Sequence, residues 1–356
     1  MESALSNDSS CATSWRRPSR RSSTFERWTW WRRFRPRTQT TGITTRETTV
    51  YDVTIIGGGP AGTSAALALG RARRRTLLFD SGQGRNGSAS TVRMFFSRDG
   101  AAPEDLRAEA AYQLGSYPDV ETREQRVVTA KGAGDEFVVR TEDGTTYASR
   151  RLLLTAGVTD VLPPIPGLAD LWGKNAVTCP YCHGWEVRDR PLGVIMMSHE
   201  DVYFSLMLLK WSVDVSFFTN GSALDPTGRS TLEGAGIRVI DGDIAAVNRD
   251  EKNDSVILLA GGASFSCATL FLRPPFEHNG GFVDDLGCRV LDDTCIEVDE
   301  HGQTSVPGVY AAGDLARRPS MPAAATYVVA AAAEGTLAAL SIDRDMMLAD
   351  IPKGTT

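Results

Sequence analysis

Two cysteines three positions apart, Cys179 and Cys182, are the residues whose type and spacing could do chemistry in this chain. They stand in the segment CPYCHGWE. A Cys-x-x-Cys pair can close a redox disulfide, supply half of a zinc site, or be two unrelated buried thiols. Structural zinc needs four ligands, and the other cysteines and histidines offer no second pair at a suitable spacing. Because a short Cys-x-x-Cys loop opening a helix lowers a thiol pKa, we favour redox chemistry and expect no metal.

A glycine-rich turn, GGGPAG at residues 57–62, follows an apolar stretch with the pattern of a buried strand at 51–56. An Ala- and Leu-rich helix is predicted after it. In such a unit Gly57 permits a tight bend, Gly59 lets backbone N–H groups approach a pyrophosphate, and Gly62 lets the helix pack closely on the strand. The turn therefore predicts a phosphate-binding strand–turn–helix unit.

The strand predicted next, at residues 76–79, ends in Asp80. A carboxylate at this place can accept a hydrogen bond from a ribose hydroxyl, so the two units together predict a dinucleotide site. Further elements are expected in order along the chain: a helix at 104–114, strands at 137–140, 145–148 and 151–157, a Pro-rich hinge at 163–167, a second strand–turn–helix unit at 192–211, and a strand ending in Gly313 and Asp314 before a helix at 323–340.

Composition bounds the possible classes of protein. The chain has 356 residues, 42% of them hydrophobic and 23% charged, which is enough for two globular domains. It has no run of 18 apolar residues, so no membrane span is expected. Its six cysteines do not make a disulfide-stapled secreted scaffold, which leaves the cytoplasm as the default location.

Charge is unevenly spread along the chain. Residues 1–50 hold ten Arg and four acidic residues, a net charge of +6. Because the whole chain has a net charge of −6, residues 51–356 carry −12. An acidic body argues against nucleic acid as a substrate. Residues 1–48 are rich in Arg, Ser and Thr without helical or strand periodicity, and we predict a disordered leader; an RNA-binding, membrane-surface or transit segment is the alternative.

Four motifs in register resemble the low-molecular-weight thioredoxin reductase family from about Tyr51 to Leu340. They are GGGPAG, the TAG turn at 155–157, CPYCHG, and TSVPGVYAAGD at 304–314. The resemblance implies an α/β fold with two Rossmann-like three-layer domains, of which the FAD domain is discontinuous. The implied division is a leader at 1–48, the FAD domain at 49–161 and 276–345, an NAD(P)-like domain with the cysteines at 162–275, and a tail at 346–356.

The same resemblance implies a homodimer and FAD as cofactor. The residues that we assign to the cofactor are Gly57, Gly59, Pro60, Ala61, Gly62, Asp80, Arg85, Asn86, Gly157, Gly313, Asp314 and Val328. Thr326 and Tyr327 stand where the family has a flavin-facing Arg-Gln pair, which leaves the backbone N–H of Val328 as the expected contact to the flavin O2 edge.

The nucleotide turn of the second domain departs from the family pattern. Met196, Met197 and Ser198 stand where the family has the glycines of a Gly-x-Gly-x-x-Ala turn. Glu200 and Asp201 follow at the helix start, where acids compete with a phosphate for the helix dipole. The basic cluster that would grip a 2′-phosphate is missing after residue 218, so we expect weak or no binding of NADPH.

His183 is the third departure, since thioredoxin reductases carry Asp at this position. An imidazole is suited to removing a proton from an incoming thiol near neutral pH, although a packed structural His is the alternative. CPYCHG with an eroded nucleotide turn resembles the flavin dithiol oxidases that close disulfides in natural products of secondary metabolism such as gliotoxin and holomycin.

The resemblance therefore implies that a small dithiol and O2 are the substrates and that Cys179, Cys182 and His183 are the catalytic residues. Cys179 would face the substrate and Cys182 the flavin. Two alternatives stay open: an NADPH-dependent reductase of thioredoxin or a similar protein, and a flavin-containing redox sensor with the cysteine pair as its switch.

Overall fold

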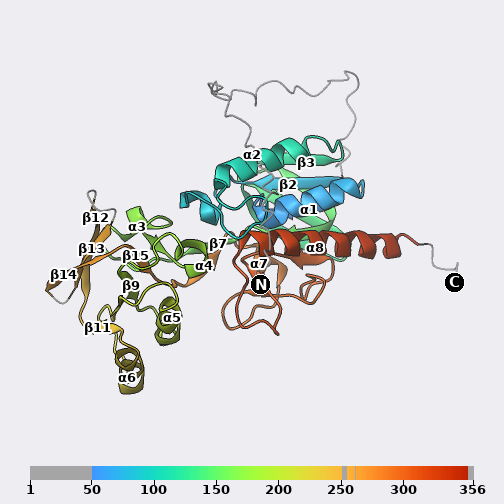
Figure 1. Ribbon diagram of the computed structural model, residues 1–356. Coiled ribbons are helices and arrows are strands. Elements are labelled where there is room, and N and C mark those ends of the chain that lie inside the picture. Colours follow the sequence, from blue (N-terminus) through green and yellow to red (C-terminus); the bar gives the residue numbers. More distant parts are fainter. Residues whose placement is uncertain (1–49, 251–254, 261, 352–356) are drawn as a thin grey trace, which may run out of the picture. The chain divides into compact units, whose positions relative to one another are not determined.

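The structure is a computed structural model that describes residues 50–250, 255–260 and 262–351 (Figure 1). The leader predicted at 1–48 and the last residues of the predicted tail lie outside the described residues. None of the helices in the described ranges is long and apolar enough to cross a membrane.

A seven-stranded sheet contains strands from both the N-terminal and the C-terminal part of the described chain. Its centre is parallel, because β1 pairs with β2 and with β6, and β18 from the C-terminal part pairs with the end of β6. β4 and β5 extend it as an antiparallel meander. The order is β3-β2-β1-β6-β5-β4 with β18 beside β6. The bounds are β1 (Val50–Ile56), β2 (Thr76–Asp80), β3 (Val120–Glu124), β4 (Val127–Ala133), β5 (Glu136–Thr141), β6 (Thr146–Leu154) and β18 (Val309–Ala311).

Helices α1 (Pro60–Arg71) and α8 (Val328–Ala349) cover one face of this sheet, and α2 (Pro103–Leu114) packs beside α1 (Figure 1). Strands buried on both faces read as nearly continuous apolar runs, which explains the composition of β1 and the end of β6. On the opposite face, side chains of β2, β4, β5 and β6 form a second buried cluster together with the short helix α7 (Phe282–Leu286).

A second, five-stranded sheet is formed by residues between 176 and 271. All of its pairings are parallel, in the order β11-β10-β9-β15-β8. A separate antiparallel sheet, β12-β13-β14, packs beside it through the buried cluster around Val247 and Leu258. The bounds are β8 (Ala176–Val177), β9 (Leu192–Ile195), β10 (Val215–Phe218), β11 (Arg238–Ile240), β12 (Ile244–Asp250), β13 (Ser255–Ala260), β14 (Ala263–Cys267) and β15 (Thr269–Phe271).

Two short strands, β7 (Val158–Asp160) and β16 (Phe276–His278), pair antiparallel and carry the chain into and out of the region of the second sheet. The remaining elements are η2 (Arg85–Ser88), α3 (Leu168–Leu171), α4 (Pro180–His183), α5 (Asp201–Leu208), α6 (Pro226–Gly234), β17 (Ile296–Glu297) and β19 (Ala316–Arg317). The two parallel sheets with their helices confirm the predicted α/β fold class, whereas the domain boundaries stay predictions.

Two predicted elements have different bounds in the structure. The separate strands expected at 145–148 and 151–157 are one continuous strand, β6, because its first residues pair with β5 and its last with β18. The last helix, expected to begin at Ala323, begins at Val328. The N–H groups of Thr326 and Tyr327 donate to carbonyls only two residues back, at 3.1 and 2.8 Å, which is turn geometry and not helix.

Candidate active site

The first glycine turn lies between β1 and the first residue of α1, Pro60. Gly57 has φ +116°, and a Cβ there would lie 2.2 Å from the carbonyl oxygen of Thr155. A Cβ at Gly62 would lie 1.8 Å from the Gly57 oxygen, whereas a Cβ at Gly59 would meet no atom within 4 Å. Gly57 and Gly62 are therefore required by packing, and only Gly59 leaves room for something else.

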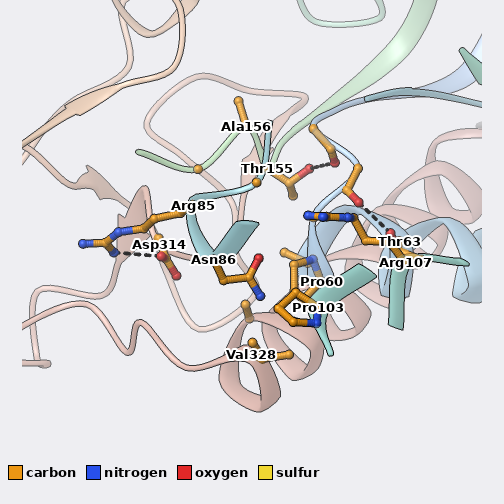
Figure 2. Close-up of a pocket in the computed structure, with 18 of the residues that line it drawn as sticks. Pro60, Thr63, Arg85, Asn86, Pro103, Arg107, Thr155, Ala156, Asp314 and Val328 are labelled. Carbon is orange, nitrogen blue, oxygen red and sulfur yellow. Dashed lines mark hydrogen bonds and ion pairs between the residues drawn. The ribbon is translucent and has the colours of Figure 1, made fainter. Parts of the chain in front are cut away.

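That room is a cavity of about 650 Å³ beside the turn (Figure 2). Its walls come from the β1–α1 unit, the loop after β2, α2, the residues before α8, and the cysteine segment. Gly62 alone of the predicted site residues is outside the lining, because it packs under the turn. The predicted residues that line the cavity are Gly57, Gly59, Pro60, Ala61, Asp80, Arg85, Asn86, Gly157, Cys179, Cys182, His183, Gly313, Asp314 and Val328.

Arg85 is held between two carboxylates in this wall. Its guanidinium lies 2.5 Å from Asp160 in β7 and 2.8 Å from Asp314, and the second contact is drawn in Figure 2. The Asp160 side chain is only 6% exposed, so this ion pair is well shielded from water. The Asp314 carboxylate, predicted to bond a cofactor, is thus already paired with a cation.

The amide of Gly313, next to Asp314, also has a partner within the chain. It donates to Oε2 of Glu334 in α8 at 3.0 Å. Burial raises the pKa of Glu334, a residue that the sequence analysis did not single out. Asp80 accepts a 2.9 Å hydrogen bond from the N–H of Gly82, which fixes the loop that follows β2.

The two cysteines are in unequal environments. Cys179 is the N-cap of α4, and its sulfur accepts from the backbone N–H of Cys182 at 3.2 Å. A hydrogen bond from the Cys182 thiol lowers the pKa of Cys179, against the opposing effect of burial. The pKa of Cys182 is raised, because its proton is shared with Cys179 and because it is buried. When the reduced pair ionises, the first proton is therefore lost from Cys179.

His183 ends the same short helix. Its Nδ1 atom is buried and has no hydrogen-bond partner among the described residues. Burial lowers the pKa of His183, so the imidazole is neutral near pH 7. Arg93 and Glu186, which form a 2.9 Å ion pair, act on this pKa in opposite directions. The site thus holds a neutral ring nitrogen able to accept a proton beside the dithiol.

The turn between β9 and α5 is occupied by a side chain of the protein itself. Asp201 is buried, and its Oδ2 accepts from the N–H groups of Met197 and Ser198 at 2.7 and 2.8 Å. Its Oδ1 accepts from Nε of Arg273 at 2.9 Å. Glu200, expected to crowd this turn, is instead 83% exposed. An internal carboxylate therefore uses the amides that a phosphate would need here.

The cavity lining also includes residues to which the sequence analysis gave no role in the site, among them Arg107 and Tyr327. Arg107 of α2 lines the cavity, but a single Arg on a predicted helix gives no signal of its own. Tyr327 lines it as well, and its pKa is raised by burial and by the nearby Cys179 and Cys182. In the described ranges, no group of three or more His, Cys, Asp or Glu side chains is arranged to hold a metal ion.

Comparison with known proteins gives consistent matches. Residues 51–200 and 221–334 match the family model for pyridine nucleotide-disulphide oxidoreductases. Thioredoxin reductase tcpT of Claviceps purpurea (strain 20.1) is 32% identical over 280 residues, which span 74% of this chain and 86% of that protein.

Two solved structures are similar over most of the chain. The oxidoreductase from Agrobacterium tumefaciens is 37% identical, with a TM-score of 0.78 over 84% of this chain and 99% of that one. HlmI is 34% identical, with a TM-score of 0.78 over 87% of this chain and 96% of that one. The chain therefore belongs to the pyridine nucleotide-disulphide oxidoreductase family and is a thioredoxin reductase-like, FAD-dependent disulfide oxidoreductase.

Proposed function

We propose that the protein is an oxygen-using dithiol oxidase that closes a disulfide in a small molecule through the Cys179–Cys182 pair. The observation that carries the proposal is the Asp201 carboxylate on the amides of Met197 and Ser198. A bound pyrophosphate would have to displace a buried carboxylate and break its 2.9 Å contact with Arg273. Electrons are therefore expected to come from the substrate and not from NADPH.

The residues around the large cavity fit FAD. A Cβ at Gly59 would meet no atom within 4 Å, so the turn amides are open to a pyrophosphate. Asp80 is placed for a ribose, and the N–H of Val328, the first residue of α8, is without a partner among the described residues. When bound there, FAD would take the electron pair of the cysteine dithiol and deliver it to O2, which yields hydrogen peroxide.

The covalent steps belong to the cysteines. A substrate thiolate attacks Sγ of Cys179 in the oxidised pair, a mixed disulfide forms, and Cys182 leaves as a thiolate. The second substrate thiolate then attacks the substrate sulfur of the mixed disulfide, which releases the substrate disulfide and Cys179 as a thiolate. The lowered pKa of Cys179 makes it the better leaving group in this second step.

His183 would remove the proton from the incoming thiol. Its neutral ring, with no hydrogen-bond partner for Nδ1 among the described residues, gives it the capacity to accept this proton. The two substrate protons are matched by the two that hydrogen peroxide carries away, so the overall reaction is dithiol plus O2 to disulfide plus hydrogen peroxide.

An NADPH-dependent reductase of thioredoxin or a similar protein is the second candidate. It is favoured by the relatives, since several of those between 24 and 32% identical are named thioredoxin reductase. It is opposed by the occupied β9–α5 turn. Likeness to HlmI supports the dithiol oxidase branch.

The deciding experiment is anaerobic reduction of the purified flavoprotein. We expect a small dithiol to bleach the flavin absorbance within the time of one catalytic turnover. Micromolar NADPH or NADH should leave the absorbance unchanged over minutes. Admission of air should then restore the absorbance and release hydrogen peroxide. Rapid bleaching by NADPH would replace the oxidase by the reductase.

We also propose a homodimer. Helix α8 exposes apolar side chains along its length, and a second copy of the chain would cover them. They are Leu337, Leu340, Met347 and Leu348. Light scattering should give twice the mass of the 38.5 kDa chain, and Leu340→Glu with Met347→Glu should give a monomer.

A further inference from the structure

Arg107 is a cation without a protein counter-charge in the wall of the cofactor cavity. It lies on α2, is half-buried, and lines the cavity. No carboxylate among the described residues forms an ion pair with it, and no described hydrogen bond uses its guanidinium. Figure 2 shows its side chain in the cavity on the side of Thr63 and Pro60, at the start of α1.

The other arginines of the same wall are accounted for. Arg85 is paired with Asp160 and Asp314. Arg126 donates to Oε1 of Gln83 at 2.7 Å, and Arg98 is exposed to water. Arg107 thus differs from its neighbours in being both sheltered and unpaired.

The backbone at Gly84 leaves space for the guanidinium. A Cβ at Gly84 would lie 2.8 Å from Nη1 of Arg107, so the absence of a side chain at Gly84 makes room for the charge. Both residues line the cavity together with Gly58 and Gly59 of the glycine turn. The cation and the turn amides therefore face one common space.

We propose that Arg107 is the counter-charge for the pyrophosphate of the bound dinucleotide. A half-buried charge without a partner costs free energy, and a bound anion recovers it. A guanidinium offers several donors in one plane, which suits phosphate oxygens, and charged hydrogen bonds are the strong ones. The glycine turn supplies only N–H groups and the dipole of α1, so Arg107 adds a full positive charge from a half-buried position.

The inference uses FAD as the cofactor and is independent of whether the enzyme is an oxidase or a reductase. Its test is therefore binding to the apoprotein and not turnover. FAD would be titrated into apoprotein of the wild type, Arg107→Met, Arg107→Lys and the control Arg71→Met, with flavin fluorescence as the signal. Arg71 is an exposed arginine in the last turn of α1, outside the cavity lining.

We expect Arg107→Met to weaken FAD binding by about 10- to 100-fold, the effect of one charged hydrogen bond. Arg107→Lys should lie between it and the wild type, and Arg71→Met should match the wild type. Between 50 and 500 mM KCl the FAD affinity of the wild type should fall more steeply than that of Arg107→Met. Salt screens the contact between Arg107 and the pyrophosphate, and the variant lacks this contact.

Competition with fragments of FAD shows which part of the cofactor Arg107 contacts. ADP should displace FAD less well from Arg107→Met than from the wild type, whereas adenosine, which lacks phosphate, should compete equally with both. An FAD affinity of Arg107→Met within twofold of the wild type would overturn the proposal, as would an equal loss for adenosine. Circular dichroism checks folding, with Arg107→Gln as a second neutral variant; if neither neutral variant folds, Arg107 belongs to the fold and the proposal is wrong.

Discussion

Oδ2 of Asp201 lies 2.7 Å from the backbone nitrogen of Met197, in the turn where a Rossmann-like domain usually binds a phosphate. The same carboxylate reaches Arg273, 72 residues further along the chain. The second domain thus keeps its strand–turn–helix topology, and the Asp201 carboxylate accepts the hydrogen bonds of the turn amides. The amides of Met197 and Ser198 therefore have an acceptor without a bound nucleotide.

Replacing Asp201 should destabilise the protein. Asp201→Asn removes the charge opposite Arg273 from a buried position, and we expect the free energy of unfolding to fall by about 3 kcal/mol. Urea denaturation measures this loss. The matched control is Glu200→Gln, whose side chain is 83% exposed and should have almost no effect. Equal stability of the two variants would contradict the internal role of Asp201.

Substitutions in the first glycine turn should separate folding from cofactor binding. Gly59→Val points into open space, so the protein should fold but purify without yellow colour. Gly57→Val should fail to fold, because its Cβ would lie 2.2 Å from the Thr155 oxygen at φ +116°. Absorbance at 450 nm per mole of protein is the measurement, and full flavin content in Gly59→Val would show that the pyrophosphate lies elsewhere.

The reduced cysteines should react at different rates. Because the pKa of Cys179 is lowered and that of Cys182 is raised, iodoacetamide at pH 7 should label Cys179 at least tenfold faster. Peptide mass spectrometry after short labelling times gives the ratio. Preferential labelling of Cys182 would exchange the proposed roles.

Single cysteine variants test which thiol serves the flavin. In Cys179→Ser we expect a long-wavelength charge-transfer band from the remaining Cys182, and in Cys182→Ser we expect none. Since burial still raises the pKa of Cys182 when Cys179 is absent, this band should gain strength only on the alkaline side of the ordinary range of a free thiol. Absorbance spectra across a pH titration check both points, and a band in Cys182→Ser alone would reverse the assignment.

The pH dependence of dithiol oxidation should report His183. A base with a pKa lowered by burial stays unprotonated at pH 6.5, so the rate should fall only at pH values below that. His183→Asn should remove this acid limb and slow the reaction by about 10²-fold near neutrality. Stopped-flow rates from pH 5 to 8 test the shape, and an unchanged profile in His183→Asn would leave His183 a structural role only.

The sequence by itself determined the local units of this site. Glycines at fixed spacing specify a turn whatever surrounds them, which is why residues 57–62 and the end of β2 could be located without coordinates. The Cys-x-x-Cys pair is likewise a local feature, since three residues bring both thiols to one end of α4. Boundaries were less accurate, as with α8, because alanine favours a helix from residue 323 while the turn at 324–327 delays it.

Only the tertiary structure decided how charges are distributed among these units. The sequence places Asp201 next to Glu200 at a helix start. Its burial and its pairing with Arg273 follow from how β9, α5 and the end of β15 pack. Arg85 and Asp314 are 229 residues apart in sequence, and Arg107 is left unpaired although acidic residues flank it along α2. Such pairings depend on distances of a few ångströms between distant segments, and a one-dimensional pattern contains no measure of them.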